Sequence, residues 1–187
     1  MKNIPTKLVI LDRDGVINLD SDKYIKHPDE WVAIPGSLEA ISKLTHAGYK
    51  VVVCTNQSGI GRGLFDVDTL SAMHDKLHKQ LAKHGGIIDA IFFCPHTDED
   101  KCTCRKPNNG MFLEIAKRFD LGDSLAGIPV VGDSLRDLQG GVSLGAEPHL
   151  VLTGKGEKTR EKGGLPPYTA IHTDLAAFVN HWLAANL

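Results

Sequence analysis

Short runs of apolar residues alternate along the chain with longer stretches in which apolar residues recur every third or fourth position. The short runs are typical of strands buried on both faces, and the longer stretches are typical of helices with one buried side. Strands are predicted at residues 8–11, 49–54, 87–93, 128–131, 149–152 and 169–172, and helices at 35–48, 66–84, 110–119, 135–144 and 173–187. This alternation predicts an α/β fold: a doubly wound, Rossmann-like parallel sheet with helices on both faces.

Two polar stretches lack this periodicity. Residues 18–30, rich in Asp, Lys and His, are expected to form a loop over one end of the sheet, and residues 155–167 a mobile connection. Three histidines, His74, His78 and His84, lie on or near the 66–84 helix. We expect them on its solvated side rather than at a metal site.

The length of 187 residues suits one well-buried core and is too short for two, so a single domain spanning residues 1–187 is predicted. The net charge of −2 gives no electrostatic reason to expect nucleic acid or an anionic membrane as a partner. The apolar runs are too short for a membrane span, and the N-terminal residues leave no room for a signal peptide. We therefore expect a cytoplasmic monomer that acts on a small molecule.

Two carboxylates follow the first predicted strand. Asp12 and Asp14 come directly after the apolar run at residues 8–11 and are followed by Gly15. Residues two apart leave a strand on the same side, so both side chains can point to one place beyond the strand end. Like charges this close repel each other unless a cation lies near them, and oxygen ligands favour Mg²⁺. A polar Asp-Gly turn without function would look the same in the sequence.

Further polar side chains stand at other predicted strand ends. Thr55 and Asn56 follow the second strand, Asp133 follows the fourth with Asp137 four positions later, and Lys106 precedes a helix. In a parallel sheet the carboxyl ends of the strands face one crevice. Carboxylates, a hydroxyl group and a lysine at one place are what phosphoryl transfer through a covalent carboxyl phosphate needs.

In this order, Asp-x-Asp-Gly, a strand-terminal Thr, a Lys and Gly-Asp-x-x-x-Asp resemble the four motifs of the haloacid dehalogenase superfamily of phosphatases. The resemblance covers residues 12–137. It implies these roles: Asp12 attacks phosphorus; Asp14 acts as acid and base; Thr55 and Lys106 hold the phosphoryl oxygens; Asp12, Asp133 and the carbonyl of Asp14 bind Mg²⁺; and Asp137 supports that magnesium site. No cap domain fits between the first two motifs, so loops at 18–30, 59–65 and 94–104 are expected to cover the site.

A cysteine-rich segment precedes the motif lysine. Cys94, His96, Cys102 and Cys104 place three thiolates and an imidazole within eleven residues, a set that suits tetrahedral zinc. All four ligands come from the protein, so the zinc is expected to be structural and to place the residues that follow Cys104. The alternative is three reduced surface thiols beside an unrelated histidine.

The cysteine segment narrows the resemblance to two related groups, the heptose 1,7-bisphosphate 7-phosphatases and the histidinol-phosphate phosphatases. Both carry Cys-Pro-His, Cys-x-Cys and Arg-Lys-Pro. Residues 55–63, Thr-Asn-Gln-Ser-Gly-Ile-Gly-Arg-Gly, are more similar to the heptose enzymes, which serve lipopolysaccharide and related heptose synthesis. Ser134 and Asn109 depart from the residues common in that group.

A sugar bisphosphate implies two charged ends and a polar middle. The phosphate that reacts would meet Asp12 and Mg²⁺, and the other would lie at the rim near Arg105 and Arg62. The remaining candidates for substrate contact, chosen for their polar side chains near the predicted site, are Asp20, Asp22, Lys23, Asn56, Gln57 and Ser58.

A function of another class shares these features. Phosphoacceptor signalling domains also carry clustered carboxylates at the end of a parallel sheet, but their aspartyl phosphate persists. An acid and base at Asp14 would hasten both steps of turnover and argues against that alternative.

Overall fold

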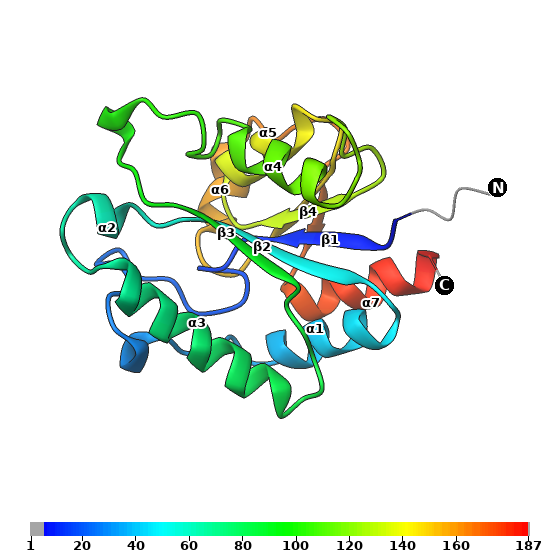
Figure 1. The fold of residues 1–187 in the computed structure, drawn as a ribbon. Coiled ribbons are helices and arrows are strands. Elements are labelled where there is room, and N and C mark those ends of the chain that lie inside the picture. The colour runs from blue at the N-terminus through cyan, green and yellow to red at the C-terminus, as the bar shows by residue number, and fades with distance from the viewer. Residues whose placement is uncertain (1–5, 187) are drawn as a thin grey trace.

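The computed structural model describes residues 6–186, which contain a six-stranded parallel sheet (Figure 1). The strands are β1 (Leu8–Leu11), β2 (Lys50–Asn56), β3 (Ala90–Cys94), β4 (Pro129–Gly132), β5 (Glu147–Val151) and β6 (Ala170–His172). They lie in the order β3-β2-β1-β4-β5-β6. The chain builds outward from β1 in both directions, so the carboxyl ends of β1, β2 and β4 meet where doubly wound sheets bind ligands.

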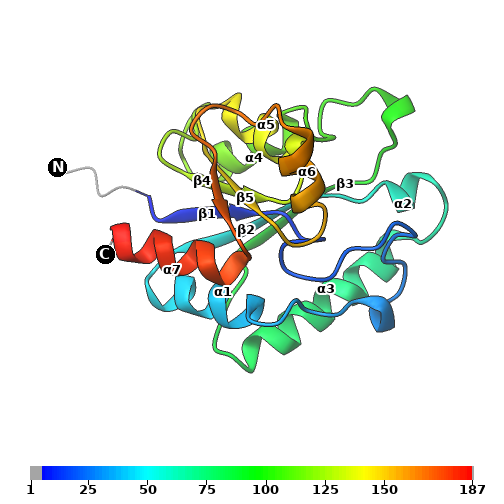
Figure 2. The same ribbon diagram turned by 180° about the vertical axis from the view of Figure 1, so that it is seen from behind.

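Helices cover both faces of the sheet, as Figure 1 and the reverse view in Figure 2 show. One face carries α1 (Ser37–His46), α3 (Val67–Ala82) and α7 (Leu175–Asn186), and the other carries α4 (Gly110–Arg118) and α5 (Leu135–Val142). Two short helices, α2 (Ser58–Gly61) and α6 (Gly156–Lys162), lie beyond the carboxyl ends of the strands. Within residues 6–186, none of the helices is long and apolar enough to cross a membrane.

The central strand β1 is buried on both faces because its four side chains alternate between two apolar clusters. Val9 and Leu11 pack in the cluster that includes α1, α3 and α7, whereas Leu8 and Ile10 pack in the cluster that includes α4. Burying such a side chain stabilises the fold by about 1.5–3 kcal/mol. The strand that carries the two carboxylates is therefore held from both sides.

The predicted strands and helices are present, and the parallel α/β fold is confirmed. The ends of the elements differ by at most three residues, most clearly at β3, which begins at Ala90 rather than Ile87. The side chain of Asp89 accepts a hydrogen bond from the Val51 backbone, so the segment before Ala90 joins the sheet through a side chain. In contrast, β2 continues through Thr55 and Asn56, which pair with β3.

The prediction of a mobile connection over residues 155–167 is wrong for residues 156–162, which form α6. The helix has no apolar stripe that a sequence could show, because Gly156 is its only buried residue. Polar contacts hold it instead, one to the end of β4 and one within the helix. Thr159 donates a hydrogen bond to the Asp133 carbonyl over 2.8 Å, and Glu157 pairs with Arg160 at 2.6 Å.

The polar stretch at residues 18–30 is a loop, as predicted, apart from a short 3-10 helix at Pro28–Glu30. Lys76 of α3 fastens its end by donating hydrogen bonds to the carbonyls of Pro28 and Trp31, over 2.6 and 2.8 Å. Trp31 is fully buried. The loop is thereby tied to α3 on one side of the strand ends.

Candidate active site

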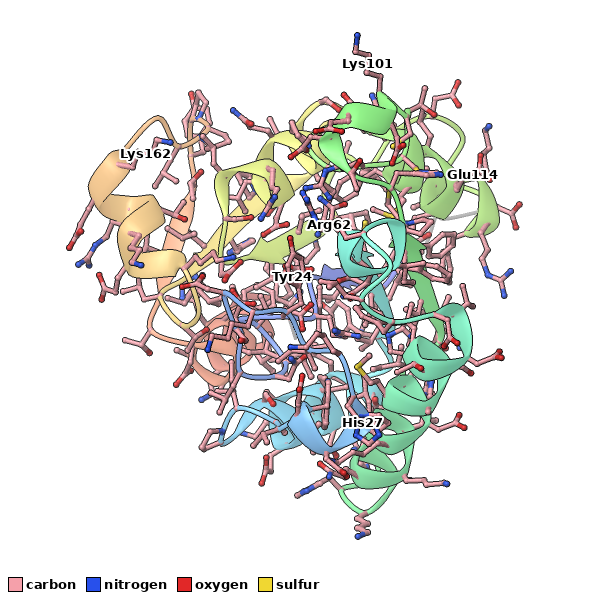
Figure 3. The ribbon with its side chains drawn as sticks, turned by 90° about the vertical axis from the view of Figure 1, so that its left-hand side faces the viewer. Tyr24, His27, Arg62, Lys101, Glu114 and Lys162 are labelled. Carbon is pink, nitrogen blue, oxygen red and sulfur yellow. The ribbon has the colours of Figure 1, made fainter. Side chains whose placement is uncertain are left out.

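A cavity of about 300 Å³ opens at the carboxyl ends of β1, β2 and β4. Most of the predicted site residues line it: Asp12, Asp14, Asp20, Asp22, Asn56, Gln57, Ser58, Arg62, Arg105, Lys106, Asp133 and Asp137. Figure 3 looks toward this end of the molecule and shows Tyr24, from the 18–30 loop, near Arg62. Of the residues predicted for catalysis, magnesium or substrate, two do not line the cavity: Lys23 is exposed, and Thr55 is buried and hydrogen-bonded to Gln57.

Three carboxylates meet at the base of the cavity around one lysine. Oxygen atoms of Asp12, Asp133 and Asp137 lie within 4.8 Å of one another. The ammonium group of Lys106 is 3.1 Å from Asp12 and 2.8 Å from Asp137, and it donates a 2.6 Å hydrogen bond to the Cys54 carbonyl. We refer to Asp12, Asp133, Asp137 and Lys106 as the carboxylate cluster.

The carboxylate cluster holds more negative charge than its single cation offsets. Burial, and then repulsion from Asp137, raises the pKa of Asp12 to about 7 and that of Asp133 to about 8. Burial alone would also raise the pKa of Asp137, but Lys106 beside it holds this pKa below its usual value. Burial alone would lower the pKa of Lys106, but the nearby carboxylates of Asp12 and Asp137 have the larger effect and raise it. A divalent cation would relieve the remaining repulsion, so the cluster suits Mg²⁺.

Two glycines enclose the carboxylate of Asp133. A side chain at either Gly15 or Gly154 would collide with that carboxylate, and both residues have the positive φ angles that glycine tolerates, 81° and 57°. The backbone N–H of Lys155 donates a hydrogen bond to Asp133 over 2.8 Å. The sequence between β5 and α6 therefore positions one of the candidate metal ligands.

Asp14 lies apart from the carboxylate cluster, although it follows Asp12 by only two residues. Its carboxylate accepts hydrogen bonds from Arg13, from Asn18 and from Gln57, each at 2.9 Å at the shortest. Burial would raise the pKa of Asp14, but the Arg13 charge and these hydrogen bonds lower it below its usual value. The two neighbouring carboxylates thus have different environments: Asp12 faces the other carboxylates and Lys106, whereas Asp14 faces hydrogen-bond donors.

Asn56 fixes the backbone of Lys106. The Asn56 side chain donates to the Lys106 carbonyl over 3.1 Å and accepts from the Lys106 N–H over 3.0 Å. Thr55 accepts a 2.9 Å hydrogen bond from Gln57, which also donates to Asp14. In this structure Asn56 and Thr55 therefore organise other site residues, while Gln57 and Ser58 border the cavity.

The four predicted zinc ligands come together. The Sγ atoms of Cys94, Cys102 and Cys104 are 3.1 to 3.7 Å apart, and Nδ1 of His96 is 3.2 Å from Cys104. A tetrahedron with Zn–S bonds of about 2.3 Å has edges of about 3.8 Å. The donor set and its spacing are therefore compatible with a structural zinc ion held by four protein ligands.

The cysteine segment also holds Arg105. Its backbone N–H points to Cys102, and its guanidinium donates to the His96 carbonyl over 3.3 Å and to Asp98 over 2.6 Å. Arg105 is only 8% exposed and is already paired with Asp98. It borders the cavity in a fixed position rather than projecting freely from the rim.

Three charged residues that line the cavity were not predicted from the sequence: Asp98, Arg136 and Lys155. Arg136 stands in the first turn of α5, and its guanidinium forms no hydrogen bond or ion pair within residues 6–186. Lys155 pairs with Asp20 at 3.1 Å across the mouth of the cavity. The available signal for Arg136 was its place one residue before Asp137, at the start of a helix that follows a motif strand.

One histidine differs from expectation. His78 and His84 are exposed, as expected for the solvated side of α3. His74 is instead partly buried and lies 3.2 Å from the Arg13 guanidinium. The sequence could not show this contact, because the two residues are 61 positions apart.

Comparisons with known proteins agree with this site. The family model described as polynucleotide kinase 3 phosphatase matches residues 7–135, and the one described as HAD-hydrolase-like matches residues 103–178. A crystal structure of D,D-heptose 1,7-bisphosphate phosphatase from Bordetella bronchiseptica, complexed with magnesium and phosphate, superposes with a TM-score of 0.94. It shares 57% identity, and the alignment covers 96% of this chain and 99% of that one. The corresponding Burkholderia thailandensis structure has a TM-score of 0.76, the same identity and the same coverage of both chains.

Curated relatives extend the match across nearly the whole chain. D-glycero-β-D-manno-heptose-1,7-bisphosphate 7-phosphatase of Bordetella bronchiseptica is 58% identical over 95% of this chain and 98% of its own. The proteins of the same name from Pseudomonas putida and Neisseria meningitidis serogroup A are 53% and 50% identical, over 91% and 96% of this chain and 96% of each relative. The resemblance inferred from the motifs is confirmed: the chain belongs to the phosphatases of the haloacid dehalogenase superfamily and, within them, to the D-glycero-β-D-manno-heptose-1,7-bisphosphate 7-phosphatase family.

Proposed function

We propose that this enzyme removes the 7-phosphate of D-glycero-D-manno-heptose 1,7-bisphosphate in a magnesium-dependent reaction through an aspartyl phosphate. The observation that carries the proposal is a single cavity with a carboxylate cluster at its base and guanidinium groups at its rim. The relatives of 50–58% identity are named for this activity.

The chemistry rests on the two carboxylates after β1. An oxygen of Asp12 attacks phosphorus as the ester P–O bond breaks, and Asp14 donates a proton to the departing alkoxide oxygen. A water oxygen then attacks the phosphorus of the aspartyl phosphate while Asp14 takes up a proton from that water. The bond between Asp12 and phosphorus breaks, inorganic phosphate leaves, and both carboxyl groups return to their starting states.

The remaining residues of the carboxylate cluster prepare Asp12 for a charged substrate. Asp12, Asp133 and the carbonyl of Asp14 would hold Mg²⁺, and the ion when bound would offset the negative charge of the approaching phosphate. Lys106 supplies a second positive charge at the same place. Asp137 orients Lys106 and also accepts hydrogen bonds from the backbone and the hydroxyl of Ser134, over 3.0 and 2.7 Å.

The second phosphate of the substrate would lie at the rim. Arg136 and Arg62 both line the cavity. The pKa of Asp98 is lowered mainly by Arg105 and also by the charges of Arg136 and Arg62, so all three guanidinium groups lie near Asp98. Arg105 is committed to Asp98, whereas Arg136 is free to form a bidentate pair with a phosphate. We therefore assign Arg136, beside Arg105 and Arg62, to the phosphate at C1, and Asp20, Asp22 and Ser58 to the sugar hydroxyls.

The rim charges separate this substrate from histidinol phosphate, the runner-up. Histidinol phosphate presents a cation at the end away from its phosphate, and three guanidinium groups would repel it. A phosphoacceptor signalling domain is disfavoured by Asp14, whose carboxylate borders the cavity beside the nucleophile.

We also propose that residues 1–187 form a single domain and that the enzyme works as a cytoplasmic monomer, without nucleic acid or membrane as a partner. One continuous sheet spanning β1 to β6 supports a single domain. Three of the four cysteines belong to the candidate zinc group, Cys54 is buried in the core, and none of the four is in a disulfide, which suits a reducing compartment.

Initial rates on matched esters test the proposal. Heptose 1,7-bisphosphate, heptose 7-phosphate and histidinol phosphate are compared at equal concentration, with Mg²⁺ and with a chelator. The bisphosphate should give the highest kcat/KM, phosphorus NMR should show the C1 phosphate retained, and the chelator should abolish turnover. A preference for histidinol phosphate would show that the substrate is wrong.

A further inference from the structure

Arg13 lies between the two catalytic carboxylates in the sequence and is completely buried. Its guanidinium forms a fork on the Asp14 carboxylate, with Nη2 2.9 and 3.1 Å from the two oxygens and Nε 3.2 Å from one of them. The third nitrogen, Nη1, is 3.2 Å from Nε2 of His74 on α3. The guanidinium therefore joins Asp14 to a helix on one face of the sheet.

The protonation of His74 follows from its partner. A guanidinium can only donate hydrogen bonds, so Nε2 of His74 must accept and must carry no proton. His74 is then neutral, with its proton on Nδ1. Burial, and then the neighbouring Arg13 charge, lowers the pKa of His74 to about 4, which agrees with a neutral ring.

Stability alone does not account for an arginine at this position. Replacing a buried ion pair with well-packed apolar residues is often neutral or stabilising. A bidentate guanidinium, however, fixes the plane of a carboxylate in a way that a single charge does not. Asp14 needs such orientation, because a proton must pass between its oxygen and a substrate oxygen in both steps.

We propose that Arg13 and His74 are positioning residues for the acid–base carboxylate: Arg13 fixes the orientation of Asp14, and His74 fixes the orientation of Arg13. Asn18 and Gln57 complete the donors around Asp14, but only Arg13 connects it to another layer of the fold. The inference rests on the proposed phosphatase chemistry and does not depend on which sugar phosphate is the substrate.

The proposal predicts a dependence on the leaving group. An alkoxide needs a proton from Asp14 as it departs, whereas 4-nitrophenolate is stable enough to leave without one. A disturbed Asp14 should therefore slow the first step with a sugar phosphate and leave the first step with 4-nitrophenyl phosphate nearly unchanged. Hydrolysis of the aspartyl phosphate needs Asp14 as a base with either ester, so the first turnover must be measured separately.

The test compares His74→Leu, His74→Gln and Arg13→Lys with the wild type. In His74→Leu the kcat for the sugar phosphate should fall about 10-fold and in Arg13→Lys about 100-fold, with small changes in KM, since misplacement by about 1 Å can cost 10²-fold. The first-turnover release of 4-nitrophenol should change by less than about threefold and be followed by slow turnover. His74→Gln, whose side-chain oxygen can accept from Arg13, should recover most of the loss.

His78→Leu is the matched control, because His78 lies one helical turn from His74 and is exposed. It should behave like the wild type. Equal losses in the first turnover of the two esters, or full activity of His74→Leu on the sugar phosphate, would overturn the positioning role. Failure of Arg13→Lys to fold leaves the His74 variants to decide. A wild type inactive on both esters would overturn the proposed function and this inference with it.

Discussion

Ionisable side chains are buried at two places in the sheet, and their surroundings differ. At the ends of β1 and β4, Asp12 and Asp133 of the carboxylate cluster lie near Lys106 and border a cavity. On β5 and β6, His149 and His172 are 6% and 9% exposed and form a hydrogen bond of 3.0 Å with each other.

The histidine pair packs against aromatic rings of α7. Phe178 approaches both imidazoles edge-on, at 4.8 and 5.5 Å between ring centroids, and Trp182 approaches His149 at 5.5 Å. Nε2 of His149 is buried without a hydrogen-bond partner in the part of the chain that the structure describes. This environment suits neutral rings.

Burial favours the neutral form in both places, but only one place is built for charge. The pKa of Asp12 is raised to about 7 and that of His149 is lowered to about 4, in each case mainly by burial. A cationic partner and an opening toward solvent distinguish the carboxylate cluster from the histidine pair. Burial of an ionisable group is therefore weak evidence of function, and burial with a counter-charge at a cavity is strong evidence.

The largest effect is expected from removing the nucleophile. Asp12→Asn should lower kcat by at least about 10⁴-fold, as losses of that size follow removal of a catalytic unit. The fold should persist, because Asp12 stands at a strand end, and circular dichroism can check this. Asp123→Asn, at an exposed position in the segment before β4, is the control and should stay active. Substantial turnover by pure Asp12→Asn protein would contradict the covalent route.

The second-largest effect is expected from replacing one of the zinc ligands, which are partly buried. Cys104→Ser should lose bound zinc, lower the free energy of unfolding and reduce activity, because Arg105 and Lys106 follow directly. The loss should be smaller than the roughly 10 kcal/mol that zinc contributes to small zinc peptides, since only one loop depends on it. Metal analysis and denaturant unfolding measure it, with Cys54→Ala as the control that keeps one zinc per chain. Unchanged activity after zinc removal would separate the loop from catalysis.

The histidine pair should affect stability and not catalysis. The pKa of His149 is lower in the folded chain than its ordinary 6.5. Between pH 6.5 and pH 4 the unfolded chain therefore binds protons that folded His149 does not. As the pH falls from 6.5 to 4, the free energy of unfolding should decrease by up to about 3 kcal/mol. Above pH 6.5 the histidine pair should not make stability depend on pH.

Urea unfolding at several pH values measures this effect, and His149→Phe should flatten the profile below pH 6.5. The exposed His78, changed to Gln, should leave the profile as it is in the wild type. If His149→Phe altered kcat at pH 7 as strongly as it altered acid stability, the distinction between the two buried places would be lost.

The smallest effect sharpens the comparison within the cavity itself. Arg136→Gln should reduce kcat/KM for the bisphosphate by about 10- to 150-fold, because a charged hydrogen bond typically contributes about 1.5–3 kcal/mol. The heptose 7-phosphate should lose less than about twofold, since it places no phosphate at the rim. Arg118→Gln, an exposed change at the end of α4, is the control. Equal losses on both esters would remove Arg136 from the subsite.

The sequence was informative wherever function coincided with a strand end. Apolar runs placed β1 and β4, and parallel topology then required Asp12 and Asp133 to meet, which the structure bears out. The cysteine spacing likewise predicted a group that does come together. In both cases the relevant residues are either close in the chain or fixed by the topology of the sheet.

Contacts across layers could not be predicted. Arg13 and His74 meet only because α3 packs beside β1, and Lys155 reaches Asp20 only because α6 turns back over the strand ends. Periodicity reports which face of a helix is buried, but it does not report which side chain of another element lies opposite. A charge-rich helix such as α6 carries even less signal, because polar contacts replace an apolar stripe.

The enclosure of Asp133 by Gly15 and Gly154 has a consequence for how substitutions are tolerated. Neither glycine has a group that could take part in the reaction, yet any side chain at either position must displace the Asp133 carboxylate. In a scan of every substitution, Gly154 would therefore rank with the reactive residues, while Lys158, which is exposed and lies four positions later, would accept most changes. Positions that do not tolerate mutation in this protein would therefore include glycines that leave room for a carboxylate, as well as the residues that carry out the chemistry.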